Sequence, residues 1–227
     1  MASRKSGKPL WTAVDEYLGG VFAPSDEKLD AALKANRKAG LPAIDVSPLQ
    51  GKFLSVLVAM TQPKRVLEIG LLGGYSTIWM ARALPRGGRI VSLEFSPKHA
   101  EVAKANLKHA GLVGRVDIRV GPALESLPVL AAERGGPFDL IFIDADKGNN
   151  PNYLEWAIKL SRRGTVIVVD NIVRQGKITD AKSADPDIRG TRLCLKNMAA
   201  HPRLTSFAMQ TVGVKGLDGY ALAVVVR

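Results

Sequence analysis

The sequence predicts an α/β fold built around a mostly parallel, doubly wound sheet, with additional helices at its N-terminal end. Three observations lead to this prediction. From residue 65 onward, short apolar runs alternate with amphipathic segments, a pattern typical of parallel strands joined by helices. Before residue 61 the pattern is helical only. The chain has 227 residues, of which 46% are apolar, which is enough for one such domain with a buried core.

Three helices are predicted before the first strand, over residues 12–22, 25–39 and 48–60. Ser25 is the expected N-cap of the second helix, and Gly40 follows its last residue. Pro48 occupies the first position of the third helix, where proline is well tolerated. We treat the chain as a single domain, in which residues 1–60 form a helical region that covers the site and residues 61–227 form the core.

The core alternates strands and helices. Seven strands are expected, over residues 65–69, 89–94, 116–120, 139–144, 165–170, 205–212 and 220–226. Five helices are expected, over residues 76–83, 97–110, 124–134, 153–160 and 190–200. Pro85 and Gly111 stop the first two of these helices. The Gly-rich segment 213–219 is a short connection, so the last two strands should be antiparallel. The prediction is therefore a seven-stranded sheet with one antiparallel strand near the C-terminus.

The net charge of +11 raises the question of an acidic partner. A basic balance can indicate nucleic acid or a membrane surface. However, the lysines and arginines are spread along the chain, and the densest short cluster is Arg4, Lys5 and Lys8. We find no basic strand rich in aromatic residues, the kind that stacks on bases. We therefore expect no nucleic-acid partner, and an RNA or other macromolecular acceptor stays as the alternative.

The sequence gives several indications of cellular location. No apolar run reaches the ~18 residues that a membrane-spanning helix needs. The polar, basic first residues are not followed by the apolar stretch of a secretory signal. Cys194 is the only cysteine, so an internal disulfide is excluded. We expect a cytoplasmic protein without a membrane partner.

A glycine-containing turn follows the first strand of the core. Gly70, Gly73 and Gly74 let the backbone turn sharply and approach a ligand closely. The helix that follows offers free N–H groups and the positive end of its dipole. Glu68 lies on the strand just before this turn, where an acid is a poor neighbour for phosphate. It suits a cationic ligand that carries an amino group and a sulfonium.

The next two strand ends also favour a nucleotide. Glu94 ends the second strand, and its carboxylate can accept hydrogen bonds from both ribose hydroxyls. NAD enzymes use the same device. The third strand runs into Gly121-Pro122-Ala123, whose small residues would let an adenine ring lie against the backbone. A nicotinamide dehydrogenase is a weaker alternative, because the turn lacks the full G-x-G-x-x-G fingerprint.

The most informative residues follow two apolar strands of the predicted sheet. The strand at 139–144 delivers Asp144, Asp146 and Lys147 at its carboxyl end, and the strand at 165–170 delivers Asp170 and Asn171 at the same edge. Carboxylate and amide oxygens are the ligands that Mg²⁺ prefers, with waters and substrate completing its shell. The competing interpretation is a set of separate helix caps and surface acids.

Histidine and cysteine offer little for zinc binding or catalysis. His99 and His109 fall on a predicted surface helix, and His201 precedes Pro202 in a loop, so all three are interpreted as structural or solvated. A zinc site is not expected. Cys194 is interpreted as a small helical residue, not as a catalytic thiol.

Taken together, these motifs resemble the cation-dependent O-methyltransferases, the group of catechol and caffeoyl-CoA O-methyltransferases and especially its small bacterial members. The resemblance covers nearly the whole chain from Val46 onward. It depends on the residues at 67–70, 74–76, 142–147, 170–171, 215–216 and 218–219. It implies a class I methyltransferase with a Rossmann-like sheet.

The resemblance also implies S-adenosylmethionine as methyl donor. Its site would be lined by Val46, Glu68, Gly70, Leu71, Gly74, Tyr75, Ser76, Glu94, Ala123 and Asp144. Asp144, Asp170 and Asn171 would bind a divalent cation, Mg²⁺ in the first place and Mn²⁺ or Ca²⁺ as substitutes. Lys147 would be the general base, and Tyr153 would lie near the acceptor pocket.

The implied reaction is metal-dependent methyl transfer to a hydroxyl of a catechol-like or other vicinal-dihydroxy aromatic small molecule. Dimers are common in the group, so a homodimer is expected. Two departures are visible. Relatives often carry Thr where this chain has Gly73, so we expect a looser loop there, and many carry Asp in place of Glu94.

The acceptor itself is left open by the sequence. Basic residues in the segment 173–189 (Arg174, Lys177, Lys182 and Arg189) would favour an acidic or CoA-linked acceptor. The alternative interpretation of this segment is a solvated loop. A protein that binds the cofactor without catalysing a reaction is a further alternative, because a fold does not guarantee an activity.

Overall fold

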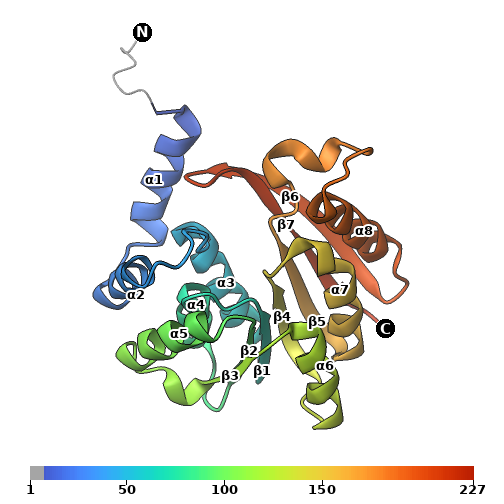
Figure 1. Cartoon of the computed structure of the whole chain (residues 1–227), viewed down its shortest axis with the longest axis horizontal. Helices are drawn as coiled ribbons and strands as arrows, with labels where there is room; N and C mark the ends of the chain where they lie inside the picture. Colours follow the sequence, from blue (N-terminus) through green and yellow to red (C-terminus); the bar gives the residue numbers. More distant parts are fainter. Residues whose placement is uncertain (1–7) are drawn as a thin grey trace.

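The computed structural model describes residues 8–227 and contains one seven-stranded sheet in the order β3-β2-β1-β4-β5-β7-β6 (Figure 1). The strands are β1 Arg65–Ile69, β2 Arg89–Glu94, β3 Val116–Val120, β4 Phe138–Ile143, β5 Ser161–Asp170, β6 Leu204–Gly213 and β7 Gly216–Val225. The first five strands pair in parallel, and β7 is antiparallel to both of its neighbours. The predicted fold class, with one reversed strand near the C-terminus, is therefore confirmed.

Helices occupy both faces of this sheet. They are α1 Leu10–Phe22, α2 Glu27–Lys38, α3 Pro48–Thr61, α4 Tyr75–Ala83, α5 Pro97–His109, α6 Ala123–Ala132, α7 Asn150–Lys159 and α8 Pro186–Ala200. Three short 3₁₀ helices connect them, at Val113–Arg115, Lys147–Asn149 and Arg174–Thr179. The third one falls in the segment 173–189, so this segment is partly helical.

The predicted cap of α2 is wrong by one residue. Asp26, not Ser25, caps the helix, and its carboxylate accepts from the backbone N–H groups of Lys28 (2.9 Å) and Leu29 (3.1 Å). A single carboxylate oxygen accepts both bonds, and its negative charge suits the positive end of the helix dipole. The Ser25 hydroxyl donates instead to Asp30 (2.6 Å).

The connection between the last two strands is shorter than predicted. The expected turn at 213–219 is mostly strand, because β6 and β7 stay paired from Leu204 opposite Val225 down to Gly213 opposite Gly216. Only Val214 and Lys215 form the turn. Two-residue connections of this kind match the twist of antiparallel strands.

The side chains of the strands alternate between the two faces of the sheet and contribute to two separate hydrophobic cores. On one face, Leu67, Ile141 and Val169 pack under α6, α7 and α8. On the other face, Val66 and Phe142 pack under α2 to α5. The two helix layers lie on opposite sides of the sheet (Figure 1). Side chains at successive strand positions point to opposite faces, so each strand end presents its polar residues at a fixed height and side.

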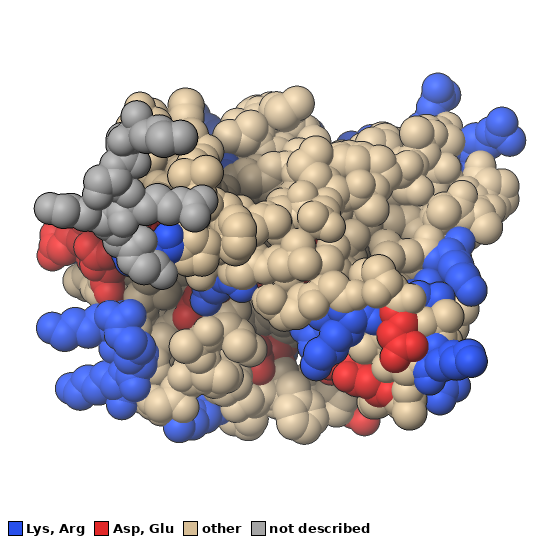
Figure 2. Space-filling view, turned by 90° about the horizontal axis from the view of Figure 1, so that it is seen from above, with Lys and Arg blue, Asp and Glu red and all other residues tan. Residues whose placement is uncertain are grey.

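Charge on the described surface is dispersed. Figure 2 shows Lys and Arg in several separate groups, with broad uncharged areas between them. Lys8 pairs with Glu16 at 2.7 Å, whereas Arg4 and Lys5 lie outside the described residues. Cys194 is buried in the core, where burial raises the pKa of its thiol to about 12. Among residues 8–227, no helix has the length and apolar character required to span a bilayer.

Candidate active site

A cavity of about 760 Å³ opens at the carboxyl ends of β1, β2, β3 and β4. This is the edge where open α/β sheets bind ligands. Many residues predicted for the cofactor and the chemistry line it, namely Val46, Gly70, Leu71, Tyr75, Ser76, Glu94, Ala123, Asp144, Lys147 and Asn171. Tyr153 also lines this cavity, although the resemblance placed it near the acceptor.

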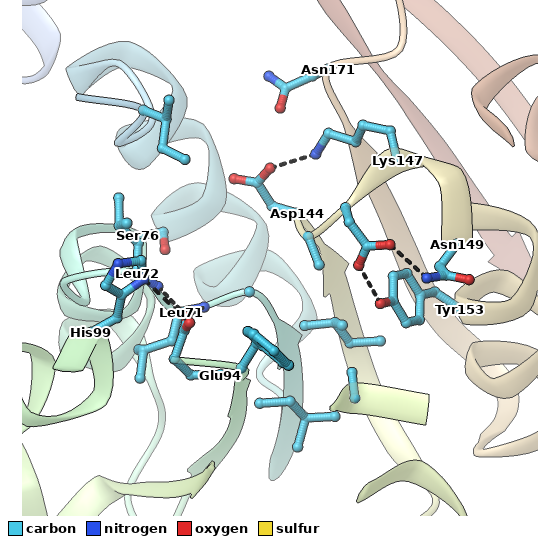
Figure 3. Close-up of a pocket in the computed structure, with 18 of the residues that line it drawn as sticks. Leu71, Leu72, Ser76, Glu94, His99, Asp144, Lys147, Asn149, Tyr153 and Asn171 are labelled. Carbon is cyan, nitrogen blue, oxygen red and sulfur yellow. Dashed lines mark hydrogen bonds and ion pairs between the residues drawn. The ribbon is translucent and has the colours of Figure 1, made fainter. Parts of the chain in front are cut away.

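Glu94 is fixed to the glycine turn that follows β1. Its Oε2 accepts from the backbone N–H groups of Leu71 (3.2 Å) and Leu72 (2.8 Å), and its Oε1 accepts from Ser96 N–H (2.9 Å). The end of β2 therefore anchors the loop after β1. The carboxylate lies at the cavity wall with its position set by three backbone groups (Figure 3).

His99 belongs to the site, which the sequence interpretation missed. Its Nδ1 lies 3.3 Å from Glu94 Oε1, and the side chain lines the cavity. The interpretation of this histidine as structural or solvated gave it no place in the cavity wall, which it has because α5 begins directly behind the end of β2. A histidine in the first turn of that helix is thereby turned toward the strand end (Figure 3).

Glu68 lies behind the cavity wall and does not line it. The side chain is fully buried and accepts hydroxyl hydrogen bonds from Ser76 (2.7 Å), Thr77 (2.7 Å) and Ser92 (2.6 Å). Burial raises the pKa of this carboxyl to about 7, against the lowering effect of the three hydroxyls. Glu68 thus holds the start of α4 against β2, and a ligand would meet Ser76 instead.

The glycine turn is tightly packed, so the expectation of a looser loop at Gly73 is wrong. A Cβ at Gly73 would fall 1.9 Å from the side-chain oxygen of Asn36 on α2. Asn106 on α5 donates both to Gly73 O (2.9 Å) and to Asn36 Oδ1 (3.0 Å). Gly74, the N-cap of α4, lies outside the cavity lining and has a φ of +82°. Buried amide groups thus occupy the space that a side chain at Gly73 would need.

The two strand ends predicted to bind a metal do meet. Asp144 follows β4 and Asp170 ends β5, its neighbour in the sheet. Lys147 is buried, and its Nζ donates to Asp144 Oδ1 at 2.7 Å. Burial and then the negative charge of Asp144 raise the pKa of Asp170 to about 7. Figure 3 shows Asp144, Lys147 and Asn171 directed toward the same part of the cavity.

This arrangement fits a divalent cation. Asn171 adopts a left-handed backbone conformation (φ 53°), which costs energy for a residue other than glycine. Its N–H donates to Asp170 Oδ1 at 2.7 Å. Within residues 8–227, no group of three or more His, Cys, Asp or Glu side chains is placed to hold a metal. The oxygen donors available at this point are two carboxylates and one amide, a set that suits a divalent cation, and two confronted carboxylates would favour one.

The loop that carries Lys147 is braced from α7. The Tyr153 hydroxyl donates to Asp146 Oδ1 (2.5 Å), and Asn149 Nδ2 donates to Asp146 Oδ2 (2.6 Å). Burial, followed by the bond to Asp146, raises the pKa of the Tyr153 phenol. Asp146 therefore acts within the loop as an acceptor for these two groups.

A second cavity of about 560 Å³ adjoins the first. Asp170 lines it, and the two cavities share Ile44, Asp45, Val46, Asn171 and Arg174. Its outer wall is the β6–β7 turn, which hydrogen bonds with three other segments hold in place, one of them from Gln175 Nε2 to Lys215 O (3.3 Å). Val214 N–H donates to Asp15 Oδ2 on α1 (2.8 Å), and Lys215 Nζ donates to Ala43 O (3.3 Å).

Comparison with known proteins decides the family. Residues 23–223 match the family model described as O-methyltransferase. The chain belongs to the O-methyltransferase family. This finding confirms the resemblance to catechol and caffeoyl-CoA O-methyltransferases that the motifs indicated, and with it the assignment as a methyltransferase enzyme.

Relatives match this O-methyltransferase over nearly its whole length. A catechol O-methyltransferase of Mycobacterium tuberculosis is 56% identical over 212 residues, 93% of this chain and 94% of that protein. A catechol O-methyltransferase of Niastella koreensis is 49% identical over 216 residues, 95% and 98% of the two chains. The crystal structure of the Bacillus cereus O-methyltransferase in complex with S-adenosylhomocysteine (SAH) has a TM-score of 0.93 and 54% identity. The match covers 95% of this chain and 98% of that one.

Proposed function

We propose that this O-methyltransferase moves a methyl group from S-adenosylmethionine to one hydroxyl of a catechol-like small molecule, with the help of a divalent cation. One observation carries the metal and acceptor parts of the proposal. Asp144, Asp170 and Asn171 come together where the two cavities adjoin. The names of the Mycobacterium tuberculosis and Niastella koreensis relatives support a catechol acceptor.

In this proposal, the first cavity holds the cofactor. Glu94 would accept hydrogen bonds from the ribose hydroxyls, and Ala123 would allow the adenine to lie against the start of α6. The methionine part would then extend toward Val46 and Ser76. This orientation directs the methyl group toward the second cavity, next to Asp144.

Asp144, Asp170 and Asn171 would hold the cation, for which Mg²⁺ is the first candidate. When bound, it would supply a positive charge that makes a coordinated hydroxyl more acidic. The same three residues, together with the walls of the second cavity, would fix the acceptor relative to the cofactor. Holding two reactants in line can contribute up to ~7–11 kcal/mol to a rate.

Lys147 would act as general base. In its neutral form, Nζ can take the proton of the acceptor hydroxyl, and Asp144, 2.7 Å away, then stabilises the ammonium that forms. The N-terminal region, through Ile44 and Val46, would keep water out of the space between the two reactants. Transfer between a phenolate and a sulfonium neutralises both charges, so a dry site favours it.

A methyl-transfer assay tests the proposal directly. A panel of catechols is incubated with the purified chain and S-adenosylmethionine, with Mg²⁺ or with EDTA, and the products are identified by NMR. We expect mono-O-methylated catechols that form only when the cation is present. Full turnover in EDTA would remove the metal from the proposal, and methylation of RNA in place of every catechol would remove the acceptor class.

We also propose that a second copy of the chain covers α1 and the edge strand β6. None of the 13 residues of α1 is buried, and Tyr17 and Phe22 are 71% and 59% exposed. Phe207 and Met209 on β6 are also exposed. An isolated helix of this length is marginal in water, and a two-fold axis would pair these apolar surfaces with themselves.

Light scattering after size exclusion tests this proposal. The wild type should have twice the mass of one chain, and a Tyr17→Glu variant should have a lower measured mass. A monomer at every concentration would contradict this proposal.

A further inference from the structure

Glu68 is fully enclosed, so it cannot contact the cationic part of the cofactor. Its oxygens already accept three hydroxyl bonds behind the cavity wall. Another carboxylate must make that contact in the proposed function. Among the acids that do line the cavity, Asp144 is paired with Lys147 and Asp187 with Arg174. The remaining acid near the proposed methionine end is Asp45, on the loop between α2 and α3.

Asp45 is held in place by a chain of buried amides. Asn106 Nδ2 donates to Asn36 Oδ1, so the Asn36 amide can present only its NH₂ group to Asp45. Asn36 Nδ2 then donates to Asp45 Oδ1 at 2.8 Å. The same Asn36 lies against Gly73 in the glycine turn. The position of the Asp45 carboxylate is therefore tied to the turn that would hold the cofactor.

The bond from Asn36 uses a small part of what the Asp45 carboxylate can accept, since two oxygens offer about four acceptor sites. The side chain lines both cavities and is only half-buried. It also lies near the start of α4. Burial raises the pKa of Tyr75, the first residue of that helix, and the charge of Asp45 adds to this increase.

This location suits one group of the cofactor. The first N–H groups of α4 would receive the α-carboxylate of the methionine part. The α-ammonium is bonded to the same carbon, so it must lie beside that helix start. We infer that Asp45, oriented by Asn36, binds the α-ammonium of S-adenosylmethionine and of its product SAH. The inference rests on the proposed use of this cofactor.

The test compares two ligands that differ only at this end. SAH carries the amino-acid part, whereas 5′-methylthioadenosine has the same adenosine and thioether without it. Isothermal titration calorimetry gives the dissociation constant of each for the wild type and for Asp45→Asn. We expect the variant to bind SAH about tenfold more weakly, as for a lost hydrogen bond between charged groups. Its affinity for 5′-methylthioadenosine should be unchanged, which also shows that the variant is folded.

Asp30→Asn is the matched control. Asp30 is a surface acid on α2 outside both cavities, and its charge also acts on Tyr75. It makes the same charge change without contact to the cofactor, so its SAH affinity should equal that of the wild type. An unchanged SAH affinity in Asp45→Asn would overturn the inference, and so would an equal loss for both ligands. A wild type that binds neither ligand would overturn the proposed function itself.

Discussion

The two cavities are built in different ways. The walls of the first come mainly from residues directly after buried strands. Behind these walls, hydrogen bonds between the buried groups of Gly73, Asn36 and Asn106 hold the glycine turn in place. The outer wall of the second joins segments far apart in the chain, through exposed hydrogen bonds such as that from Val214 to Asp15. In the proposed function the first cavity is the cofactor side and the second the acceptor side, so the core dictates the first, whereas a few surface contacts shape the second. We therefore expect surface substitutions to alter acceptor binding without disturbing cofactor binding.

The largest effect is expected where the two sides meet. Asp170→Ala should lower metal-dependent turnover by about a thousandfold, since a metal Lewis acid contributes several kcal/mol. SAH affinity, measured by calorimetry, should stay within a few-fold of the wild type because Asp170 does not line the first cavity.

Asp139→Asn provides the control for this variant. Asp139 lies at the opposite end of β4, where it accepts from the N–H groups of Lys64 and Arg65. Its loss should reduce stability and leave the metal dependence of turnover intact. If Asp139→Asn lost activity as severely as Asp170→Ala, general destabilisation would explain both results.

The next prediction concerns Glu68, which lies behind the wall of the first cavity. Burial there disfavours the charged form of its carboxyl. Its folded pKa of about 7 exceeds the ordinary value of 4.5. Below pH 4.5 the group is protonated in both states and destabilises nothing. As pH rises from 4.5 to 7, the unfolded state gains relative stability by up to roughly 3 kcal/mol, and the effect is complete above pH 7.

Denaturant unfolding of the wild type and of Glu68→Gln at about pH 5 and about pH 8 measures this contribution. The wild type should lose more free energy of unfolding between the two values than the variant does. Asp170 titrates in the same range, and the subtraction removes its contribution because both proteins retain it. If the free energy of unfolding changed equally with pH in both proteins, burial would not disfavour the charged form of Glu68.

Gly73→Ala tests the tight packing of the cofactor side. Its Cβ would collide with Asn36, so we expect a loss of about 1–3 kcal/mol in the free energy of unfolding, together with weaker SAH binding. Gly114→Ala is the control, because a Cβ there meets nothing within 4 Å. Addition of Asn36→Ala should recover part of the stability lost in Gly73→Ala. If the two substitutions changed the free energy of unfolding strictly additively, the two positions would not interact.

The smallest effect should come from the acceptor side. Asp15→Asn weakens the bond to Val214 at the β6–β7 turn and should cost no more than about 1 kcal/mol, since the site is exposed. The Michaelis constant for the catechol should change a few-fold while SAH affinity stays constant. Glu16→Gln, which affects only the exposed pair with Lys8, should change neither. An effect of Asp15→Asn as large as that of Gly73→Ala would erase the contrast between the two cavities.

The parts of the molecule that sequence predicted well are those that short local patterns determine. The strands β1, β2 and β3 have the predicted bounds, and Asp144, Lys147, Asp170 and Asn171 lie together as expected, because parallel strand ends share an edge. The starts of α3 and α5 are also as predicted, whereas the other helix starts shifted by one to four residues, since several residues near each start can cap it.

The residues whose roles were not predicted share a physical cause: each role depends on contact between segments that are distant in sequence. Glu68 is at the predicted strand position, yet hydroxyls from α4 and β2 enclose it. His99 was interpreted as structural or solvated and not as part of the site, because its contact with Glu94 depends on how α5 leaves the sheet. Asn36 gave no signal at all, because its role exists only through packing against Gly73 and Asn106. Local periodicity contains none of this information.

The placement of β7 between β5 and β6 has a consequence for synthesis on the ribosome. β5 pairs with β7, so until residues 216–225 leave the exit tunnel, one edge of the sheet stays open to wrong partners. The hydrogen bond between Asp15 and Val214 joins residues 199 positions apart, so this contact of α1 forms only after residue 214 has been synthesised. β7 thus completes the strand pairing of both β5 and β6. A chain truncated before β7 would leave the edge of β5 unpaired and would lack the part of the second cavity's wall that Asp218 and Tyr220 supply, so we expect it to aggregate.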